Sequence, residues 1–225
     1  MAGSGREFNI LLCGETGAGK SSFISTISQG EQRPVIGDGV KSETFNVNRY
    51  PVMLNGDIYY FYDVPGFMDS LLRKSNKEIR LEVIEYFLKV DQGKLNGNSF
   101  DAILVFESFK PEPISFKRNL EKLSEMFGQT EKNIGKSVIV ACTKLDVRPQ
   151  RNPGKFRSLK ELTDDSGSFI LEWQNNYIRS KGPVNVPLDA LQLQINKFLE
   201  LMKNVSPIED VTVKELHAKI KALAV

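Results

Sequence analysis

The sequence has few cysteines and histidines, almost no net charge and no long apolar run. Of its 225 residues, two are cysteine and one is histidine, and 30 basic residues are balanced by 28 acidic ones. A net charge of +2 gives no indication of a nucleic-acid partner. Apolar runs without a charge reach only about six residues, whereas a membrane-spanning helix needs roughly 18 or more. We therefore expect neither nucleic-acid binding nor direct insertion into a membrane.

The cysteines and the chain ends give an expectation about the compartment. Cys13 and Cys142 each end a short apolar run, which is typical of buried free thiols, so we assign them neither a disulfide nor a metal. Residues 1–8 contain no apolar signal core, Met1 is followed by Ala2 rather than by the glycine that myristoylation requires, and residues 221–225 contain no cysteine for prenylation. These features predict a cytoplasmic protein.

Length and composition predict one large domain with a small appendage. Hydrophobic residues make up 40% and charged residues 26% of the chain, which is typical of globular proteins and excludes disordered and fibrous classes. At roughly 150 residues per domain, the chain corresponds to one domain and a short extra segment. We place the domain at residues 7–203 and a C-terminal helical appendage at 204–225, because Pro207 separates two apolar stripes. For His217, in the appendage, we expect a solvated side chain and no role as a base.

Short apolar runs alternate with amphipathic helical patterns along the chain. Residues 8–13, 102–106 and 138–142 have the pattern of buried strands, and Asn55-Gly56 between two β-rich runs predicts a hairpin. Alternating strands and helices favour a mostly parallel sheet covered on both faces. The expected fold class is therefore a three-layer α/β domain in which one hairpin strand is antiparallel. Helices are expected at residues 21–28, 79–87, 116–127, 188–202 and 213–223, and residues 148–154 are expected to form a loop.

A glycine-rich segment follows the first predicted strand. It matches the phosphate-loop pattern G-x-x-x-x-G-K-[ST], which arises by chance in about 1% of chains of this length. Glycines let the backbone bend around a phosphate chain, so that N–H groups and the N-terminus of the next helix point at the anion. A glycine-rich turn without a ligand is the alternative. The predicted nucleotide-binding residues are Gly14, Glu15, Thr16, Gly17, Ala18, Gly19, Lys20, Ser21 and Ser22.

Specific roles follow from the chemistry of a nucleotide phosphate chain. We expect Lys20 to neutralise β- and γ-phosphate oxygens, Ser21 to bind Mg²⁺ through its hydroxyl, and Ser22 to reach the α-phosphate. Asp63 ends a predicted strand and begins a D-x-x-G segment, so its carboxylate is expected to hold a Mg²⁺-bound water. The Gly66 N–H is expected to touch the γ-phosphate, a contact made with triphosphate and lost with diphosphate, which is the basis of a switch. An ordinary strand-ending turn is the alternative.

A third motif, Thr143-Lys144-Leu145-Asp146, follows the strand predicted at 138–142. The carboxyl end of a strand is where ligands of open α/β sheets bind. The Asp146 carboxylate can accept hydrogen bonds from N1–H and the 2-amino group of guanine, whereas adenine offers no such pair of donors. The Lys144 stem can lie along the base. This motif therefore predicts guanine rather than adenine, although about 7% of random chains of this length contain it.

With these motifs in this order, the chain resembles GTPases of the translation-factor and septin-like class. Tyr62–Ser70 looks like the V-D-T-P-G-L-F-D-T segment of the immunity-associated, avirulence-induced (AIG-type, GIMAP) GTPases. Residues 100–127 are similar to the hydrophobic box of that family. The resemblance covers residues 7–147 well and the remainder loosely. One departure is Thr143-Lys144, where family members often have Thr-Arg, and both keep a cation over the base.

The resemblance implies a Mg²⁺-dependent domain that binds GTP and GDP and whose relatives dimerise across the nucleotide face. It also implies a switch threonine that completes Mg²⁺ coordination. Thr44 is the best candidate, with Ser42 in reserve and an ordinary strand-start residue as the alternative, and we count Thr44 with Lys20 and Gly66 as candidate catalytic residues. A loop that lays amides against the guanine oxygen is expected near Ser180, where an ordinary helix end or exposed loop fits equally well.

The sequence thus predicts a guanine-nucleotide switch that hydrolyses GTP slowly. Phe67 stands where small signalling GTPases place a glutamine that orients the attacking water, and phenylalanine cannot hydrogen-bond a water. A cation delivered in trans within a homodimer, from Arg33 or Arg73, would compensate, unless both are ordinary surface arginines. Two alternatives stay open: a GTP-stabilised dimerisation or scaffold module with negligible turnover, and an ATP-dependent kinase or ATPase with the same phosphate loop.

Overall fold

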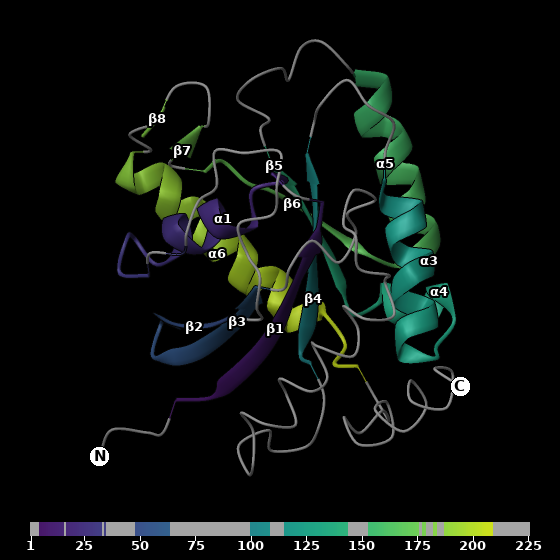
Figure 1. The fold of residues 1–225 in the computed structure, drawn as a ribbon, viewed down its shortest axis with the longest axis horizontal. Helices are drawn as coiled ribbons and strands as arrows, with labels where there is room; N and C mark the ends of the chain where they lie inside the picture. Colours follow the sequence, from purple (N-terminus) through teal and green to yellow (C-terminus); the bar gives the residue numbers. More distant parts are fainter. Residues whose placement is uncertain are drawn as a thin grey trace.

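The computed structural model of the chain has a central sheet with helices on both sides (Figure 1). It describes residues 5–15, 17–32, 34, 48–63, 100–108, 115–143, 153–175, 177–178, 182–183 and 187–208. Within these ranges, no helix is long and apolar enough to cross a membrane. The predicted fold class, a three-layer α/β domain with a mostly parallel sheet and one antiparallel strand, is confirmed.

The sheet consists of six strands: β1 (Glu7–Gly14), β2 (Asn48–Leu54), β3 (Asp57–Asp63), β4 (Ala102–Ser108), β5 (Val138–Thr143) and β6 (Phe169–Glu172). Their spatial order is β2-β3-β1-β4-β5-β6. β1 pairs in parallel with β3 and β4, and parallel pairing continues through β5 to β6, whereas β2 is antiparallel to β3. The carboxyl ends of the five parallel strands therefore lie at one edge of the sheet.

The predicted hairpin is present at Asn55-Gly56. These two residues join β2 to β3, and both have positive φ angles, of 51° and 88°. Two-residue turns of this kind match the right-handed twist of the strands, and asparagine and glycine adopt them most easily. The hairpin makes β2 the edge strand, while β3 aligns with β1 so that Asp63 lies opposite Leu12. Asp63 is thereby brought beside the segment that follows β1.

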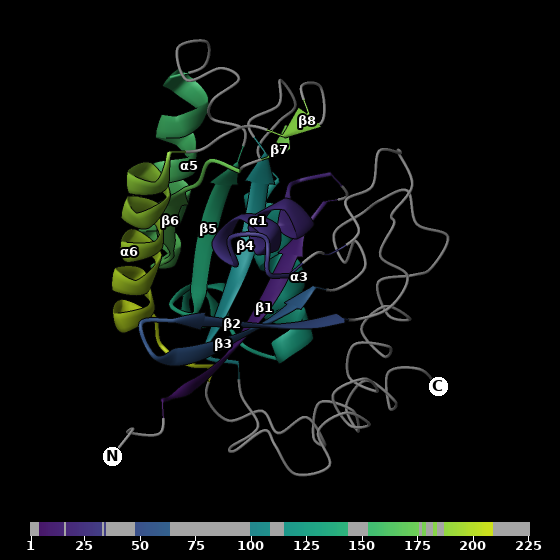
Figure 2. The ribbon, with the colours of Figure 1, turned by 90° about the vertical axis from the view of Figure 1, so that its left-hand side faces the viewer.

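Helices α1 (Lys20–Ile27) and α6 (Leu188–Asn204) cover one face of the sheet, as the side view in Figure 2 shows. The ring of Phe23 in α1 contacts four other aromatic rings at centroid distances from 4.5 to 6.3 Å. Burying each such side chain contributes about 1.5–3 kcal/mol. The helix that begins after the glycine-rich segment is therefore held firmly against the sheet. The four rings belong to Phe61, Phe106, Trp173 and Phe198.

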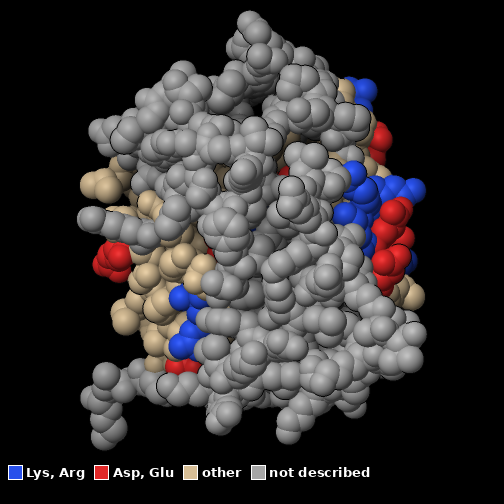
Figure 3. All heavy atoms as spheres, viewed as in Figure 1, with Lys and Arg blue, Asp and Glu red and all other residues tan. Residues whose placement is uncertain are grey.

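Helices α3 (Phe116–Phe127), α4 (Glu131–Gly135) and α5 (Pro153–Ser166) cover the opposite face (Figure 1). α3 buries the predicted apolar stripe and ends at Gly128, whose φ of 63° is the left-handed conformation that terminates many helices. Figure 3 shows basic and acidic side chains next to one another on this side of the molecule. Such a mixture of both signs is typical of solvated helix faces.

The prediction of a loop over residues 148–154 is wrong for its last two residues, because α5 begins at Pro153. Proline is tolerated in the first turn of a helix, where its missing N–H would have no intrahelical acceptor. Neither α5 nor β6, which together occupy most of residues 153–172, was expected from the sequence. Residues 148–152 and the helices predicted at 79–87 and 213–223, with His217, lie outside the described residues.

After α6 the chain runs along the amino ends of the strands. The Ser206 N–H donates to the Lys136 carbonyl at 3.1 Å, and the Ile208 N–H donates to the Phe100 carbonyl at 3.0 Å. Ile208 is buried. The first residues of the segment assigned to the appendage thus pack against the domain, and the division at 203/204 stays a prediction. Before α6, β7 (Tyr177–Ile178) and β8 (Gly182–Pro183) form a separate antiparallel pair.

Candidate functional site

The candidate site lies at the carboxyl edge of the sheet. Gly14 ends β1, Asp63 ends β3 and Thr143 ends β5. The connection from β1 to α1 is short, so the predicted phosphate loop lies between a strand and the N-terminus of a helix. Ligands of open α/β sheets bind at such an edge, because helix N-termini and loop N–H groups converge there.

Two glycines of the loop are required by close packing. Gly14 has a φ of 146°, and a Cβ atom there would lie 2.9 Å from the carbonyl oxygen of Phe106 in β4. Gly19 has a φ of 105°, and a Cβ atom there would lie 2.9 Å from Nδ2 of Asn175. Any other residue at these positions would be strained in its backbone and would displace its neighbours. The loop is thus held against β4 and against the segment that follows β6.

Lys20 places a positive charge inside the loop. Its Nζ donates to the carbonyl oxygens of Gly14 at 2.9 Å and Glu15 at 3.3 Å, and the residue is only 8% exposed. A buried ammonium group is costly unless oxygens surround it. The two carbonyls do so here, and the charge acts on nearby Asp63 as well. Ser22, in the same turn of α1, is also buried.

The Ser21 hydroxyl and the Asp63 carboxylate meet at the end of the loop. Ser21 Oγ donates to Asp63 Oδ2 at 3.1 Å, and Asp63 is 1% exposed. Among the described residues, no donor reaches the buried Oδ1. Burial raises the pKa of Asp63 above its usual value, while the Lys20 charge and the Ser21 hydrogen bond lower it. A buried carboxylate oxygen without a donor, beside a hydroxyl, is an oxygen set that fits Mg²⁺ or a water bound to it.

Thr143 fixes the loop against β5. Its Oγ1 donates to the carbonyl oxygen of Ala18 at 2.6 Å, and the residue is fully buried. The hydroxyl is therefore used within the protein, where it positions the phosphate loop. Lys144 and Asp146, the next two predicted residues of this motif, lie outside the described residues.

Asn175 is a residue of this edge that the sequence analysis missed. The Trp173 N–H donates to the Cys142 carbonyl at 2.9 Å, which extends β6 alongside β5, and Asn175 follows two residues later. It is 7% exposed and lies against Gly19. Its Oδ1 is buried, and among the described residues no donor reaches it. A buried amide with an oxygen still able to accept a hydrogen bond is thus present beside the loop.

The base-contacting loop is predicted near Ser180, a residue between β7 and β8 in the sequence. β7 is the short strand expected just before that loop, and the loop itself stays a prediction. The strand that runs parallel to β5 is β6, whose carboxyl end lies at the same edge of the sheet as the site. The signal for β6 is the apolar run that follows the turn at Gly167, where φ is 73°. Predicted residues that lie outside the described part of the chain are Thr16, Arg33, Ser42, Thr44, Gly66, Phe67, Arg73, Lys144, Asp146 and Ser180.

The prediction of two buried free thiols is confirmed for Cys13 and Cys142. Burial raises the pKa of Cys13 to about 12, a rise that the Lys20 charge opposes and the Asp63 charge increases. At neutral pH this thiol is protonated and is therefore not a nucleophile. Among the described residues, groups near the loop that can act on a ligand include the Lys20 ammonium, the Ser21 hydroxyl and the Asp63 carboxylate.

Solved structures with a similar fold include Toc33 from Arabidopsis thaliana. Its complex with GDP and Mg²⁺ has a TM-score of 0.60 at 13% identity, over 90% of this chain and 87% of that chain. The translation elongation factor SelB from Methanococcus maripaludis, in complex with the GTP analogue GppNHp, has a TM-score of 0.51 at 12% identity, over 90% of this chain and 35% of that chain. At these identities the likeness concerns the fold alone.

Similarity in sequence identifies the family. GTP-binding protein A from Dictyostelium discoideum is 33% identical over 111 residues, which are 48% of this chain and only 22% of the length of that protein. The family described as 50S ribosome-binding GTPase matches residues 9–144, a range that includes the phosphate loop, the D-x-x-G segment and Thr143. The chain therefore belongs to this family of phosphate-loop GTPases.

Proposed function

We propose that this domain binds GTP and GDP together with Mg²⁺, hydrolyses GTP slowly to GDP and phosphate, and acts as a nucleotide-dependent switch. The observation that carries the proposal is the contact between Ser21 and Asp63 beside the buried ammonium of Lys20, in a chain of a GTPase family. A cation, a hydroxyl and a carboxylate at the end of a phosphate loop are the groups that a nucleotide phosphate chain and Mg²⁺ require.

The proposal assigns guanine as the base. Asp146 would accept hydrogen bonds from the two guanine donors that adenine lacks, and the buried amide of Asn175 would add an acceptor at the same edge. We extend the proposal to Lys144, Thr44 and Gly66 in the roles that the sequence predicts for them. Membership of the AIG-type group, a domain at 7–203 with an appendage at 204–225, and a cytoplasmic location are also proposals. The family match supports the guanine nucleotide, which Toc33 binds as well.

The nucleotide retained by the purified chain tests this function. We expect denaturation to release GDP or GTP, identified by chromatography and mass. Unlabelled GTP should then displace a fluorescent GDP analogue, while ATP at the same concentration should not. If ATP displaces the analogue as efficiently as GTP, the ATP-dependent alternative is favoured. The site would then contain no acceptor that distinguishes guanine from adenine.

The Ser21→Ala variant is expected to weaken GTP binding about tenfold in Mg²⁺ and to bind like the parent in EDTA. The substitution removes a metal ligand but leaves Lys20 and the loop in place. Titration of a fluorescent GTP analogue with Mg²⁺ and with EDTA measures the difference. Ser25→Ala, one turn further along α1, is the matched control. An equal loss in EDTA would mean that Ser21 does not act through the metal.

We further propose a nucleotide-dependent homodimer. Phe67 supplies no hydrogen bond to a water, so a cation from a second copy would have to stabilise the transferring phosphoryl group. For the chloroplast translocon components atToc33 and psToc159, dimerization is important for GTPase activity, and atToc33 shares the fold of this chain. This relation supports the idea that the nucleotide face meets a second copy.

Hydrolysis per molecule is accordingly expected to rise about tenfold or more with increasing protein concentration. Phosphate release gives the rate per molecule at each protein concentration, and light scattering of the same samples gives the molar mass. Either Arg33→Ala or Arg73→Ala should abolish the rise. A flat rate with a monomer mass throughout would exclude the dimer mechanism, whereas a GTP-dependent dimer without turnover would favour the scaffold alternative.

A further inference from the structure

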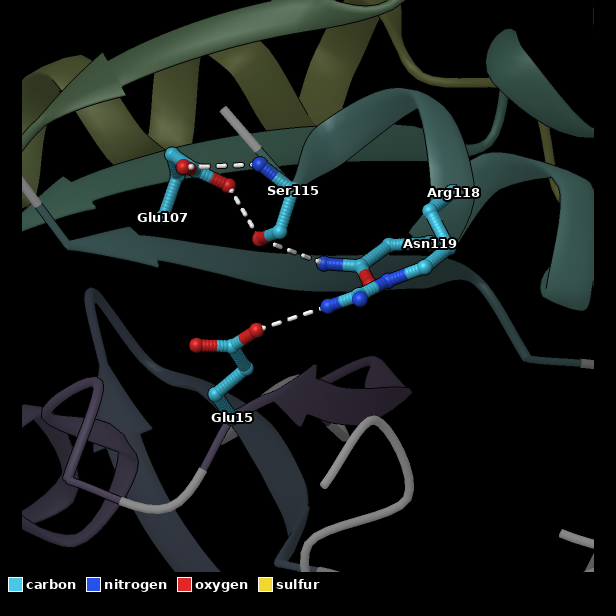
Figure 4. A network of polar contacts seen from close by, with 5 residues as sticks. All are labelled: Glu15, Glu107, Ser115, Arg118 and Asn119. Atoms are coloured by element: carbon cyan, nitrogen blue, oxygen red, sulfur yellow. Dashed lines mark hydrogen bonds and ion pairs between the residues drawn. The ribbon is translucent and has the colours of Figure 1, made fainter. Parts of the chain in front are cut away.

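The second residue of the phosphate loop carries a carboxylate that is paired with an arginine of α3. Glu15 Oε1 lies 2.8 Å from Nη2 of Arg118 in α3, and these side chains are 42% and 50% exposed (Figure 4). The backbone of Glu15 is part of the loop itself, because its carbonyl oxygen accepts from the Ala18 N–H at 3.0 Å and from Lys20 Nζ at 3.3 Å. The ion pair therefore joins α3 to Glu15, whose carbonyl oxygen contacts Lys20.

The start of α3, which carries Arg118, is held by a partly buried network of hydrogen bonds. Glu107, at the carboxyl end of β4 and 3% exposed, accepts from the Ser115 N–H at 3.1 Å and from Ser115 Oγ at 2.7 Å (Figure 4). Asn119 Nδ2 donates to the same Ser115 Oγ at 3.2 Å. A carboxylate is favourable at a helix N-terminus. Because this network fixes the first turn of α3, it also fixes the position from which Arg118 reaches the loop.

The sign of the Glu15 charge matters to the ligand of the loop. A carboxylate beside a loop that binds phosphates repels them, and the repulsion grows with the number of phosphates. A guanidinium group 2.8 Å away cancels most of that charge at the distance of the phosphate chain. Without Arg118, the half-exposed Glu15 carboxylate would repel the phosphates of a bound nucleotide, a repulsion that salt screens.

We propose that Arg118 is a positioning residue of the nucleotide site, which neutralises Glu15 so that the loop accepts a triphosphate. The inference rests on the proposed function, since it concerns affinity for GTP and GDP. It also makes α3 a part of the site.

The test compares the two single variants, whose effects have opposite signs. Arg118→Ala leaves the carboxylate unpaired and is expected to weaken a fluorescent GTP analogue about tenfold, GDP less and GMP hardly at all. Glu15→Gln leaves the guanidinium facing the phosphates and should tighten GTP binding about threefold. The double variant should return to within about twofold of the parent. All titrations are made with Mg²⁺ at low salt, and the differences should shrink at high salt.

Two controls separate this role from a structural one. Arg118→Lys, which keeps the charge, should recover most of the parental affinity, and Lys117→Ala, the exposed neighbour on α3, should bind like the parent. Thermal unfolding without nucleotide should be nearly the same for all variants, since exposed ion pairs contribute little to stability.

Two results of these titrations would contradict the inference. If Glu15→Gln weakens GTP binding as much as Arg118→Ala, the pair only braces the loop and the inference is wrong. It is also wrong if Arg118→Ala binds GTP like the parent. A parent that binds no guanine nucleotide would instead refute the proposed function, and this inference with it. A parent that binds normally, with variants that do not differ, refutes the role of Arg118 alone.

Discussion

Lys20→Ala is expected to lower the affinity for GTP and for GDP by about 1,000-fold. Removing one partner of a buried charged pair costs about 4 kcal/mol, and each 1.4 kcal/mol is a factor of ten in affinity. Lys20 is 8% exposed, and its ammonium donates to the carbonyls of Gly14 and Glu15, where the phosphates would contact it. Both nucleotides carry the β-phosphate, so the loss should be similar for the two and should persist in EDTA.

The pH dependence of this variant separates a direct role from an indirect one. The Lys20 charge lowers the pKa of Asp63, so its removal raises that pKa further above the usual value. If the lost affinity arose only from protonation of Asp63, raising the pH would restore it. We expect the loss at neutral and at alkaline pH alike. Lys160→Ala, on the exposed side of α5, is the matched control, and thermal unfolding checks the fold.

Affinity for GDP within about threefold of the parent would contradict the role of Lys20, since removing one partner of a buried charged contact typically costs about 3–5 kcal/mol. The comparison with Ser21→Ala adds a second check. Loss of the Lys20 charge should not depend on the metal, whereas loss of the Ser21 hydroxyl should. If Lys20→Ala and Ser21→Ala respond to EDTA in the same way, the assignment of the phosphate contact to Lys20 and of the metal contact to Ser21 is wrong.

Local chemistry explains which parts of the fold could be predicted. Asn55-Gly56 and Gly128 determine a turn and a helix end through their own φ preferences, and both are found where the sequence predicts them. The alternation of apolar runs likewise predicts the mostly parallel sheet. β6 has only four residues and α5 begins at a proline, so neither carries a strong local pattern. Tertiary pairing with β5 decides that β6 is a strand.

The same distinction applies to the site. The residues from Gly14 to Ser21 could be predicted as a site because a phosphate loop is contiguous in sequence, and Asp63 could be predicted because it ends a strand at a recognisable spacing. Arg118 reaches Glu15 across 103 positions of sequence. Its place depends on how Glu107 fastens the first turn of α3. A single sequence contains no periodicity or motif for such a contact, so only the packing of β4 and α3 reveals it.

The guanine assignment leads to the second large effect, a change of base preference in Asp146→Asn. We expect affinity for GTP to fall about 100-fold, because two charge-assisted hydrogen bonds contribute roughly 3 kcal/mol when buried. Xanthosine triphosphate should gain affinity, since the asparagine amide can donate to the 2-oxo group that replaces the guanine 2-amino group.

Competition of GTP, xanthosine triphosphate and ATP against a fluorescent GDP analogue measures this preference in the parent and in Asp146→Asn. Asp165→Asn, an exposed carboxylate on α5, should leave all three affinities unchanged. Magnesium and the phosphate loop are the same for each competitor, so any difference must come from the base. The loss of GTP affinity should therefore be matched by no loss for ATP, which has no donor pair for Asp146. Equal GTP affinity in variant and parent would mean that Asp146 does not contact the base and that another group selects guanine. Asn175, whose side-chain amide is buried at this edge, would then be the first residue to replace.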